Sequence, residues 1–259
     1  MPGFDEDRDY FNQGNSGTKA KKLRPVSSTS SSTVSFAKVF LYMFLYIAIT
    51  AAVAFGVGYI IAMSYAKAVA AGGTGEEVLR PYLGVLIGAA VAMLIMMLVV
   101  NFIVIRGKRS VLIPSIIYSI IVGFLFSCLT IFIDWQIIGM AFGITAGVFL
   151  LMGLIATFTR GNLAPLGMMG FGLILGAGVI ALVNWFIGSS TLYWIVSFAI
   201  FAALMFITMF DIWNIKKITE NGAGDRNISY YCAFIMYVDF INIFIRILLY
   251  LVIIFGKSK

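Results

Sequence analysis

The chain has 259 residues, of which 61% are hydrophobic and only 11% are charged. Soluble globular proteins carry about 25% charged residues, so this composition indicates an integral membrane protein. The sequence contains no histidine, which excludes most zinc and haem sites and histidine-based catalytic triads. The net charge of +7 is spread over flanks and loops, which does not favour a nucleic-acid binder.

Residues 1–34 form a polar N-terminal tail. Its charge changes from acidic around Asp5 to basic around Lys21, and it ends in a run of serines and threonines. So little apolar surface cannot offset the entropy that ordering would remove. We therefore expect residues 1–34 to be a disordered cytoplasmic tail, whose basic cluster can contact anionic lipid headgroups.

Seven apolar segments follow the tail and predict a transmembrane domain over residues 35–256. The segments lie at about 36–64, 82–105, 111–133, 136–158, 166–187, 191–213 and 230–255. Each is near or above the ~20 residues that a helix needs to cross the hydrocarbon core. Because the segments are apolar all round, they favour helices over the alternating strands of a barrel. The predicted fold class is an all-α integral membrane protein, a bundle of seven transmembrane helices.

Most connections between the segments are short, and the sixth is expected to be a longer polar loop from Lys216 to Asn227. Most lysines and arginines fall on the side of the membrane that the N-terminal tail would share. Under the positive-inside rule this distribution predicts a multi-pass protein of the plasma membrane with a cytoplasmic N-terminus. Seven crossings would place the C-terminus outside.

Glycines recur at intervals of four residues in three of the segments. They are Gly84 and Gly88, Gly139, Gly143 and Gly147, and Gly172 and Gly176. Small residues at this spacing let two helix backbones approach closely. We expect these glycines to lie at helix contacts within the bundle.

Two carboxylates, Asp211 and Asp239, lie inside the sixth and seventh apolar segments. An acid at the centre of a membrane helix costs roughly 2.5–3.5 kcal/mol on insertion scales. Counted from the expected loop at ~1.5 Å per residue, the two acids lie about 8 and 16 Å from the cytoplasmic boundary. Direct contact between them would need helix tilt or a late helix start. Arg106, which closes the second segment on the same side, is the natural cationic partner for one of them.

The seventh segment carries a polar stripe formed by Asp239, Asn242 and Arg246. At 3.6 residues per turn the three side chains lie within about 60° of one another. Such a stripe is disfavoured against lipid, so we expect helix 7 to be central, with the other helices around it. Two interpretations stay open: Arg246 neutralises Asp239 as a structural ion pair, or the stripe lines an ion or proton path.

Two neighbouring acids do not both ionise easily, so they share protons as a coupled pair. A divalent cation or Arg106 between them would favour the doubly ionised form. The pair is thus predicted to act as a latch that is ionised and bridged when shut, and protonated and released when open. Carboxylate oxygens are hard ligands, so Asp211 and Asp239 would bind calcium in preference to a soft metal.

At these residues the chain resembles the transmembrane Bax inhibitor motif family of Bax inhibitor-like proteins, including bacterial YetJ-like members. Four passages carry the resemblance: Met236 to Phe244, close to the family signature LYLDFINLF; Phe210 to Lys216; Ala141 to Ala146 with the loop from Arg160 to Leu163; and the end of helix 2 at Arg106. The resemblance covers about residues 36–255.

The resemblance implies a seven-helix bundle with helix 7 in the middle and a pH-sensitive calcium leak gated by Asp211 and Asp239. It also implies that Arg106 can latch one of the aspartates. One departure concerns helix 7, because the arginine that the family commonly carries further along would fall at Leu249. This chain has Arg246 one turn earlier, in line with Asp239, where a cation would repel calcium or act as an internal plug.

The leading hypothesis is therefore a passive, pH-sensitive cation (calcium) leak channel, not an enzyme and without catalytic residues. Its expected partners are the lipid bilayer and calcium ions or protons, and calcium is the one candidate cofactor. The first alternative is a non-conducting regulator that binds another membrane protein, although the sequence identifies no such partner. The second is an intramembrane aspartyl protease, in which two aspartates would polarise a water.

Overall fold

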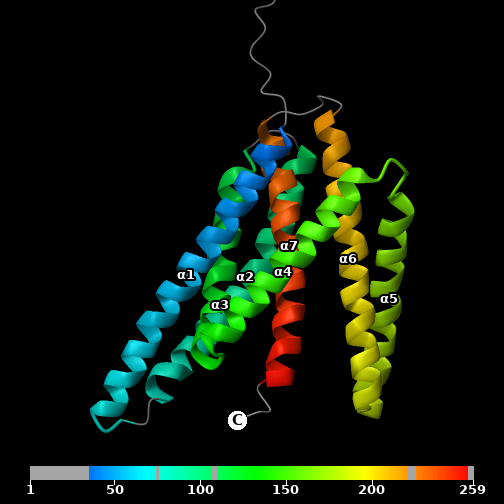
Figure 1. Ribbon diagram of the computed structural model, residues 1–259. Coiled ribbons are helices and arrows are strands. Elements are labelled where there is room, and N and C mark those ends of the chain that lie inside the picture. The colour runs from blue at the N-terminus through cyan, green and yellow to red at the C-terminus, as the bar shows by residue number, and fades with distance from the viewer. Residues whose placement is uncertain (1–34, 74–75, 107–109, 221–225, 256–259) are drawn as a thin grey trace, which may run out of the picture. The chain divides into compact units, whose positions relative to one another are not determined.

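The computed structural model describes residues 35–73, 76–106, 110–220 and 226–255, within one compact unit (Figure 1). Seven helices follow one another: α1 (Phe36–Ala70), α2 (Glu76–Arg106), α3 (Leu112–Phe132), α4 (Trp135–Phe158), α5 (Ala164–Ile187), α6 (Ser190–Glu220) and α7 (Arg226–Phe255). Each is long and apolar enough to cross a membrane, and the described residues contain no strand. The predicted all-α seven-helix membrane fold is confirmed, whereas the predicted tail over residues 1–34 lies outside the described residues.

All the helices except α3 extend beyond the predicted apolar segments. The loop predicted from Lys216 to Asn227 is wrong at both ends, because α6 continues to Glu220 and α7 already begins at Arg226. Polar side chains do not end a helix that has left the hydrocarbon core, since water or headgroups there solvate them. The apolar pattern therefore reports the membrane-embedded part of each helix rather than its full length.

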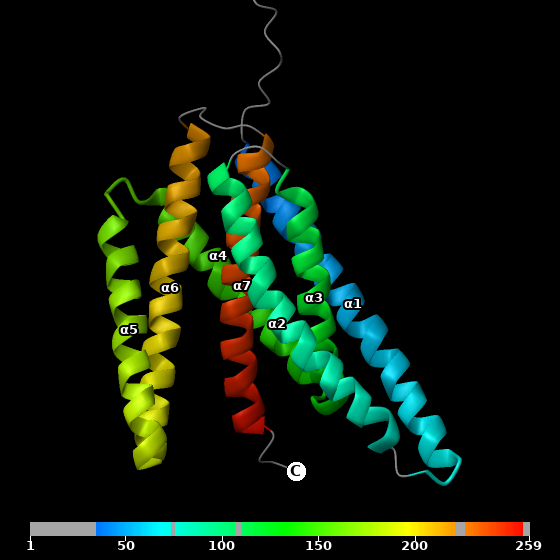
Figure 2. The same cartoon turned by 180° about the vertical axis from the view of Figure 1, so that it is seen from behind.

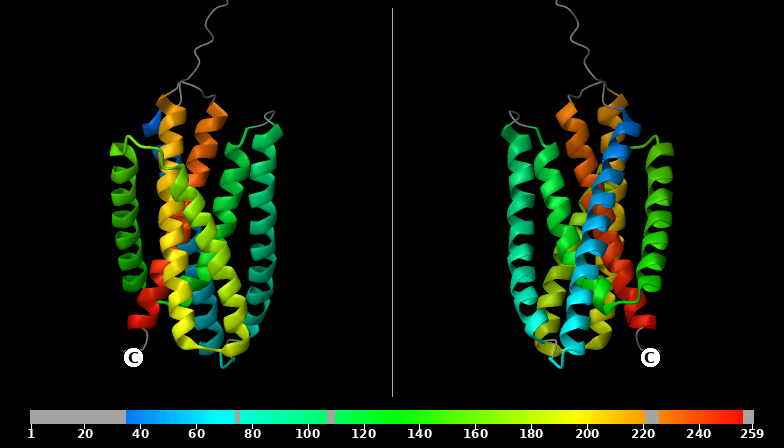
Figure 3. Two further views of the ribbon diagram at one scale, coloured as in Figure 1. Left: turned by 90° about the vertical axis from the view of Figure 1, so that its right-hand side faces the viewer. Right: turned by 90° about the vertical axis from the view of Figure 1, so that its left-hand side faces the viewer.

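Helix α7 is the centre of the bundle, as predicted. It packs against α1, α3, α4 and α6, and Figures 1 and 2 show it between the α1–α3 side and the α5–α6 side of the unit. Met236, Tyr237 and Ile243 are each 0% exposed, although a single membrane-spanning helix would expose every side chain to lipid. By contrast, α2 and α5 turn most of their apolar side chains outward. Further views show that α1 begins at one end of the bundle and α7 finishes at the other (Figure 3).

Close helix contacts use different glycines from those predicted. A Cβ atom at Gly123 on α3 would lie 2.6 Å from the carbonyl oxygen of Thr50 on α1. A Cβ atom at Gly170 on α5 would lie 2.8 Å from Ile207 on α6. The predicted glycines lie in open positions, with nothing within 4 Å of an added Cβ: Gly84, Gly88, Gly139, Gly143, Gly147, Gly172 and Gly176. That prediction was wrong, because spacing along one helix does not say which face meets a neighbour.

Candidate functional site

The structure brings Asp211 and Asp239 together. Asp211 lies nine residues before the end of α6 at Glu220, and Asp239 lies thirteen residues after the start of α7 at Arg226. These positions are about 14 and 20 Å from the adjacent helix ends at ~1.5 Å per residue. The two carboxyl groups lie close enough to interact electrostatically with each other. The difference in depth falls only from about 8 to about 6 Å, because both helices are longer than the sequence had suggested.

The pair is enclosed. Asp239 is only 8% exposed and Asp211 is half-buried. A hydrogen bond between two carboxyl groups requires a proton on one of them, because an ionised carboxylate only accepts. Among the described residues, the Oδ2 atom of Asp239 has no hydrogen-bond partner. A buried polar atom of this kind is costly unless a proton, a water or a cation satisfies it.

Sequence reasoning missed two polar residues beside this pair. Tyr231 on α7 interacts electrostatically with Asp211, and its hydroxyl donates a hydrogen bond of 3.0 Å to Oδ1 of Asn101 on α2. Asn101 in turn donates to the carbonyl oxygen of Met97, at 2.8 Å. Tyr231 and Asn101 therefore connect α2 to the face of α7 near the acids. The available signal was an amide inside an otherwise apolar helix, which is costly unless it has a partner.

Neither predicted arginine reaches the aspartates. Arg106 is exposed at the end of α2, and its guanidinium lies over the Phe102 ring, 4.4 Å from the centroid. Arg246 donates from Nη1 to the Ser197 hydroxyl on α6, at 3.5 Å. The one ion pair within the described ranges joins Lys216 to Glu220, so Arg246 does not neutralise Asp239 in this structure.

The surroundings of Asn242 differ from those that the predicted polar stripe implied. It is exposed, while Asp239 is buried and Arg246 is half-buried. The three residues share one side of α7 but meet different surroundings, because α6 covers that side unevenly. The polar stripe is therefore split into a buried acid, an exposed amide and a guanidinium that interacts with α6.

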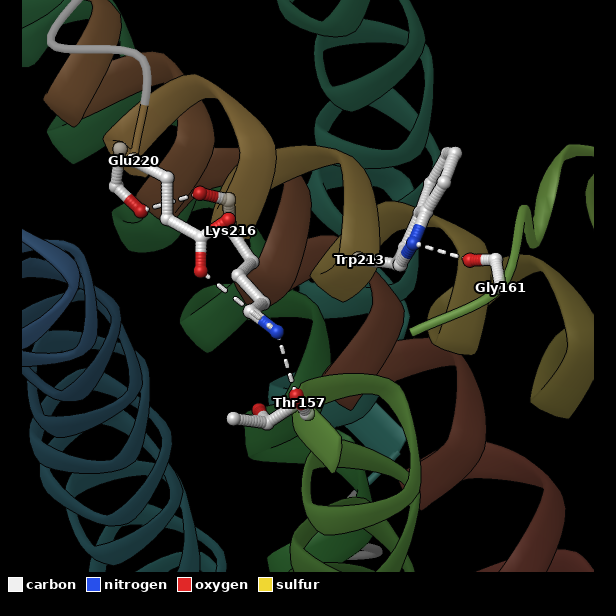
Figure 4. A network of polar contacts seen from close by, with 6 residues as sticks. Thr157, Gly161, Trp213, Lys216 and Glu220 are labelled. Carbon is white, nitrogen blue, oxygen red and sulfur yellow. Dashed lines mark hydrogen bonds and ion pairs between the residues drawn. The ribbon is translucent and has the colours of Figure 1, made fainter. Parts of the chain in front are cut away.

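The end of α6 that follows Asp211 is held by contacts with the last turn of α4 and with the α4–α5 loop (Figure 4). Lys216 donates from Nζ to the carbonyl oxygen of Thr157, at 2.6 Å, and pairs with Glu220 at 3.7 Å. Trp213 donates from Nε1 to the carbonyl oxygen of Gly161, at 3.1 Å. Because Thr157 belongs to the last turn of α4, the lysine satisfies one of its otherwise unbonded carbonyl groups and complements its dipole. These bonds fix α6 within about one and a half turns of Asp211.

A second polar layer lies on the opposite side of α7. The hydroxyl groups of Thr50 on α1 and Tyr237 on α7 are 2.6 Å apart, and Thr50 also donates to backbone carbonyls of Tyr46 and Ser119. Tyr237 is two residues before Asp239, about 200° away around the helix. Helix α7 is therefore bonded to α1 through hydroxyl groups on one side, while its carboxyl group lies near that of α6 on the other.

The described residues contain no group of three or more potential metal-ligating side chains. Two carboxyl groups alone offer four oxygen atoms, of which Oδ2 of Asp239 has no partner. Calcium normally takes six to eight oxygen ligands, so an ion bridging the pair would keep water or backbone oxygens in its shell. The donor set suits a transient hard cation better than a permanently bound one.

These features define a class: a multi-pass membrane protein whose sixth and seventh helices carry neighbouring carboxyl groups within the bundle. The chain belongs to the family described as "Inhibitor of apoptosis-promoting Bax1", whose model matches residues 33–257. The resemblance noted from the sequence is thereby confirmed.

Individual relatives are bacterial. The chain is 28% identical over 169 residues to the inner membrane protein YbhL of Escherichia coli K12, covering 63% of this chain and 72% of the relative. It is 29% identical over 175 residues to an uncharacterized membrane protein of Streptococcus pyogenes serotype M1, covering 66% and 74%. An uncharacterized protein of Borreliella burgdorferi is 30% identical over 140 residues, covering 52% and 60%.

Proposed function

We propose that this membrane protein is a pH-regulated cation leak, with calcium as the transported ion and the Asp211–Asp239 pair as its gate. The observation that carries the proposal is the proximity of two membrane-embedded carboxyl groups on different helices. No arginine or lysine within the described residues forms an ion pair with either acid. A purely structural role would be better served by a cation, since an uncompensated carboxylate in lipid is costly.

The pair has three protonation states, and each has a different effect on the contact between α6 and α7. With one proton, the carboxyl groups share a hydrogen bond and hold the helices together. With none, two carboxylates repel unless a cation bridges them, which recruits calcium. With two, the pair is neutral and has no charge with which to retain the cation.

The direction of the pH dependence follows from these states. The cation-bridged, shut form needs both acids ionised, so it is lost as the pH falls. The first proton releases the ion but leaves the two carboxyl groups joined by a shared hydrogen bond, and the second proton removes that charge-assisted bond. Calcium flux is therefore expected to rise as the pH falls and to decline as the pH rises.

Calcium flux into proteoliposomes, measured with an entrapped indicator over a pH series, tests the proposal. Asp211→Asn and Asp239→Asn are each expected to remove most of the pH dependence, because an amide does not titrate. Glu220→Gln is the matched control: it removes an exposed carboxylate from α6 without altering the pair, so the pH dependence should persist. Wild-type flux that neither aspartate substitution changes would refute the gate.

A second candidate is a non-conducting regulator that binds another membrane protein, and the close packing around α7 favours the non-conducting part of it. Met236, Tyr237 and Ile243 have no exposed surface in the bundle interior. No calcium flux at any pH, together with retained function of the protein in cells, would favour this candidate. Labelling by a transition-state-mimic inhibitor of aspartyl proteases would instead favour the protease alternative.

A further inference from the structure

Arg246 carries a charge that the bundle does not neutralise. Arg246 takes part in no ion pair within the described ranges. Its one hydrogen bond there is the 3.5 Å contact from Nη1 to the neutral Ser197 hydroxyl. A guanidinium has five N–H donors, so four of them have no partner among the described residues. The side chain is only half-buried, which leaves those donors open to the surroundings of the bundle. An unpaired guanidinium in a membrane protein calls for an anion or water.

The guanidinium points away from the aspartate pair. Ser197 donates to the Tyr250 hydroxyl at 3.1 Å, and that hydroxyl donates back to the Ser197 carbonyl oxygen at 2.9 Å. Ser197 therefore lies level with Tyr250, one turn beyond Arg246 toward the end of α7. Because Arg246 bonds this same serine, its side chain extends toward the membrane surface rather than toward Asp239.

The depth of the site matches the boundary between acyl chains and headgroups. Arg246 lies nine residues before the end of α7, and Ser197 lies seven residues after the start of α6. These separations correspond to about 14 and 10 Å, and an arginine side chain extends several ångströms further outward. The end of α5 and the start of α6 carry the exposed aromatic side chains Trp185, Phe186 and Tyr193. Exposed aromatic rings gather at membrane interfaces, which supports this placement.

The surroundings of Arg246 are those of an amphiphile. Trp194 and Phe198 stack on Tyr250 with ring centroids 6.0 and 5.5 Å apart, and form an aromatic surface beside the guanidinium. Asn242 is exposed one turn, or about 6 Å, closer to the bilayer centre. The order from the membrane surface inward is thus a cation, an amide and apolar side chains. A phospholipid presents its phosphate, glycerol esters and acyl chains in the same order.

We propose that Arg246, positioned by Ser197 and Tyr250, binds the phosphate of an anionic membrane phospholipid, with Asn242 facing its ester groups. Arginine suits this role because its planar fork can donate two parallel hydrogen bonds to one phosphate. The occupant is a membrane lipid rather than a free anion, because the site lies on the bundle face at headgroup depth. The inference is independent of the proposed leak, since it involves neither aspartate.

The test counts lipids bound to the purified full-length protein by native mass spectrometry, after titration with phosphatidylglycerol or phosphatidylcholine. The wild type is expected to retain one phosphatidylglycerol, with at least about tenfold preference over the zwitterionic lipid. Arg246→Gln should lose most of that preference. Arg160→Gln removes an exposed arginine from the α4–α5 loop and is the matched control, so its binding should equal that of the wild type.

Asn242→Leu supplies a second variant, because its exposed side chain can be changed without disturbing the core. It should weaken lipid binding severalfold while the helical circular dichroism spectrum stays unchanged. Equal binding of the two lipids, or unchanged phosphatidylglycerol binding by folded Arg246→Gln, would overturn the proposal. Displacement of the lipid by millimolar inorganic phosphate would also overturn it, because that result assigns the site to a small anion.

Discussion

At the scale of single residues, the position of Asp239 on the closely packed helix α7 determines which helix can respond to a change at the acids. On one side it meets Asp211, while two residues earlier Tyr237 bonds Thr50 on the other side. The acid therefore belongs to a helix whose rotation is fixed from the opposite side by a 2.6 Å hydroxyl contact. Any change in the acid contact has to be accommodated by α6, since α7 is held against α1.

Tyr237→Phe is expected to destabilise the bundle by about 1 kcal/mol, because it removes one buried hydrogen bond while Thr50 keeps its backbone acceptors. The measurement is unfolding of the detergent-solubilised protein. Tyr59→Phe is the matched control, since Tyr59 is 67% exposed and should tolerate the change. Equal stability of the two variants would contradict a structural role for the Thr50–Tyr237 bond.

At the scale of helices, the α5–α6 pair depends on close backbone approach at Gly170. An added Cβ would lie 2.8 Å from Ile207 and 2.9 Å from the carbonyl oxygen of Ala203. The backbone atom cannot move aside as a flexible side chain can, so the two helices would have to separate. Since α6 carries Asp211, this packing also determines where one half of the acid pair lies.

Gly170→Ala is expected to destabilise the protein by roughly 1–3 kcal/mol through overpacking. Gly172→Ala, two residues further along α5, meets nothing within 4 Å and should be neutral or stabilising by roughly 0.5–1 kcal/mol, as in an ordinary helix interior. Thermal unfolding of the two variants in parallel gives the comparison. If Gly172→Ala destabilised the protein and Gly170→Ala did not, α5 would pack against α6 through the face that carries Gly172 instead.

The sequence predicted the seven helices better than it predicted which side chains of different helices meet. Seven apolar runs of sufficient length permit one architecture, and the polar stripe of α7 correctly indicated a central helix. The proximity of Asp211 and Asp239 was left open, because depth counted along each helix from a loop assumed to begin at Lys216 takes no account of helix tilt. That lysine is instead helical and bonds the Thr157 carbonyl. The partners of Arg246 and the buried glycines depend on helix rotation, which hydropathy does not encode when a helix is apolar all round.

At the scale of the whole molecule, an odd number of crossings separates the two ends of the helical unit. The start of α1 at Phe36 and the end of α7 at Phe255 lie at opposite ends of the bundle (Figure 3). The aspartate pair lies closer to the end where α1 begins, and Arg246 lies toward the other. The proposed gate and the proposed lipid site therefore face different leaflets.

Reporter fusions after Phe36 and after Phe255 are expected to give opposite topologies in cells, with the N-terminal side cytoplasmic under the positive-inside rule. The reporters would be an alkaline phosphatase, active outside, and a fluorescent protein, active inside. Matching fusions in the α4–α5 loop at Arg160 should report the same side as the N-terminus. Identical reports from the two ends would mean that one helix does not cross.

Lys216 holds one end of α6 against α4, so the rest of α6 can swing about that point. Lys216 is fixed to α4, Asp211 lies five residues away from it, and Ser197 lies nineteen residues away on the same rigid helix. These distances are about 8 and 29 Å. If α6 pivots at its clamped end, a displacement of 1 Å at the acids becomes roughly 4 Å at Ser197. One proton at one end of the helix would thereby produce a movement several times larger at the opposite membrane surface.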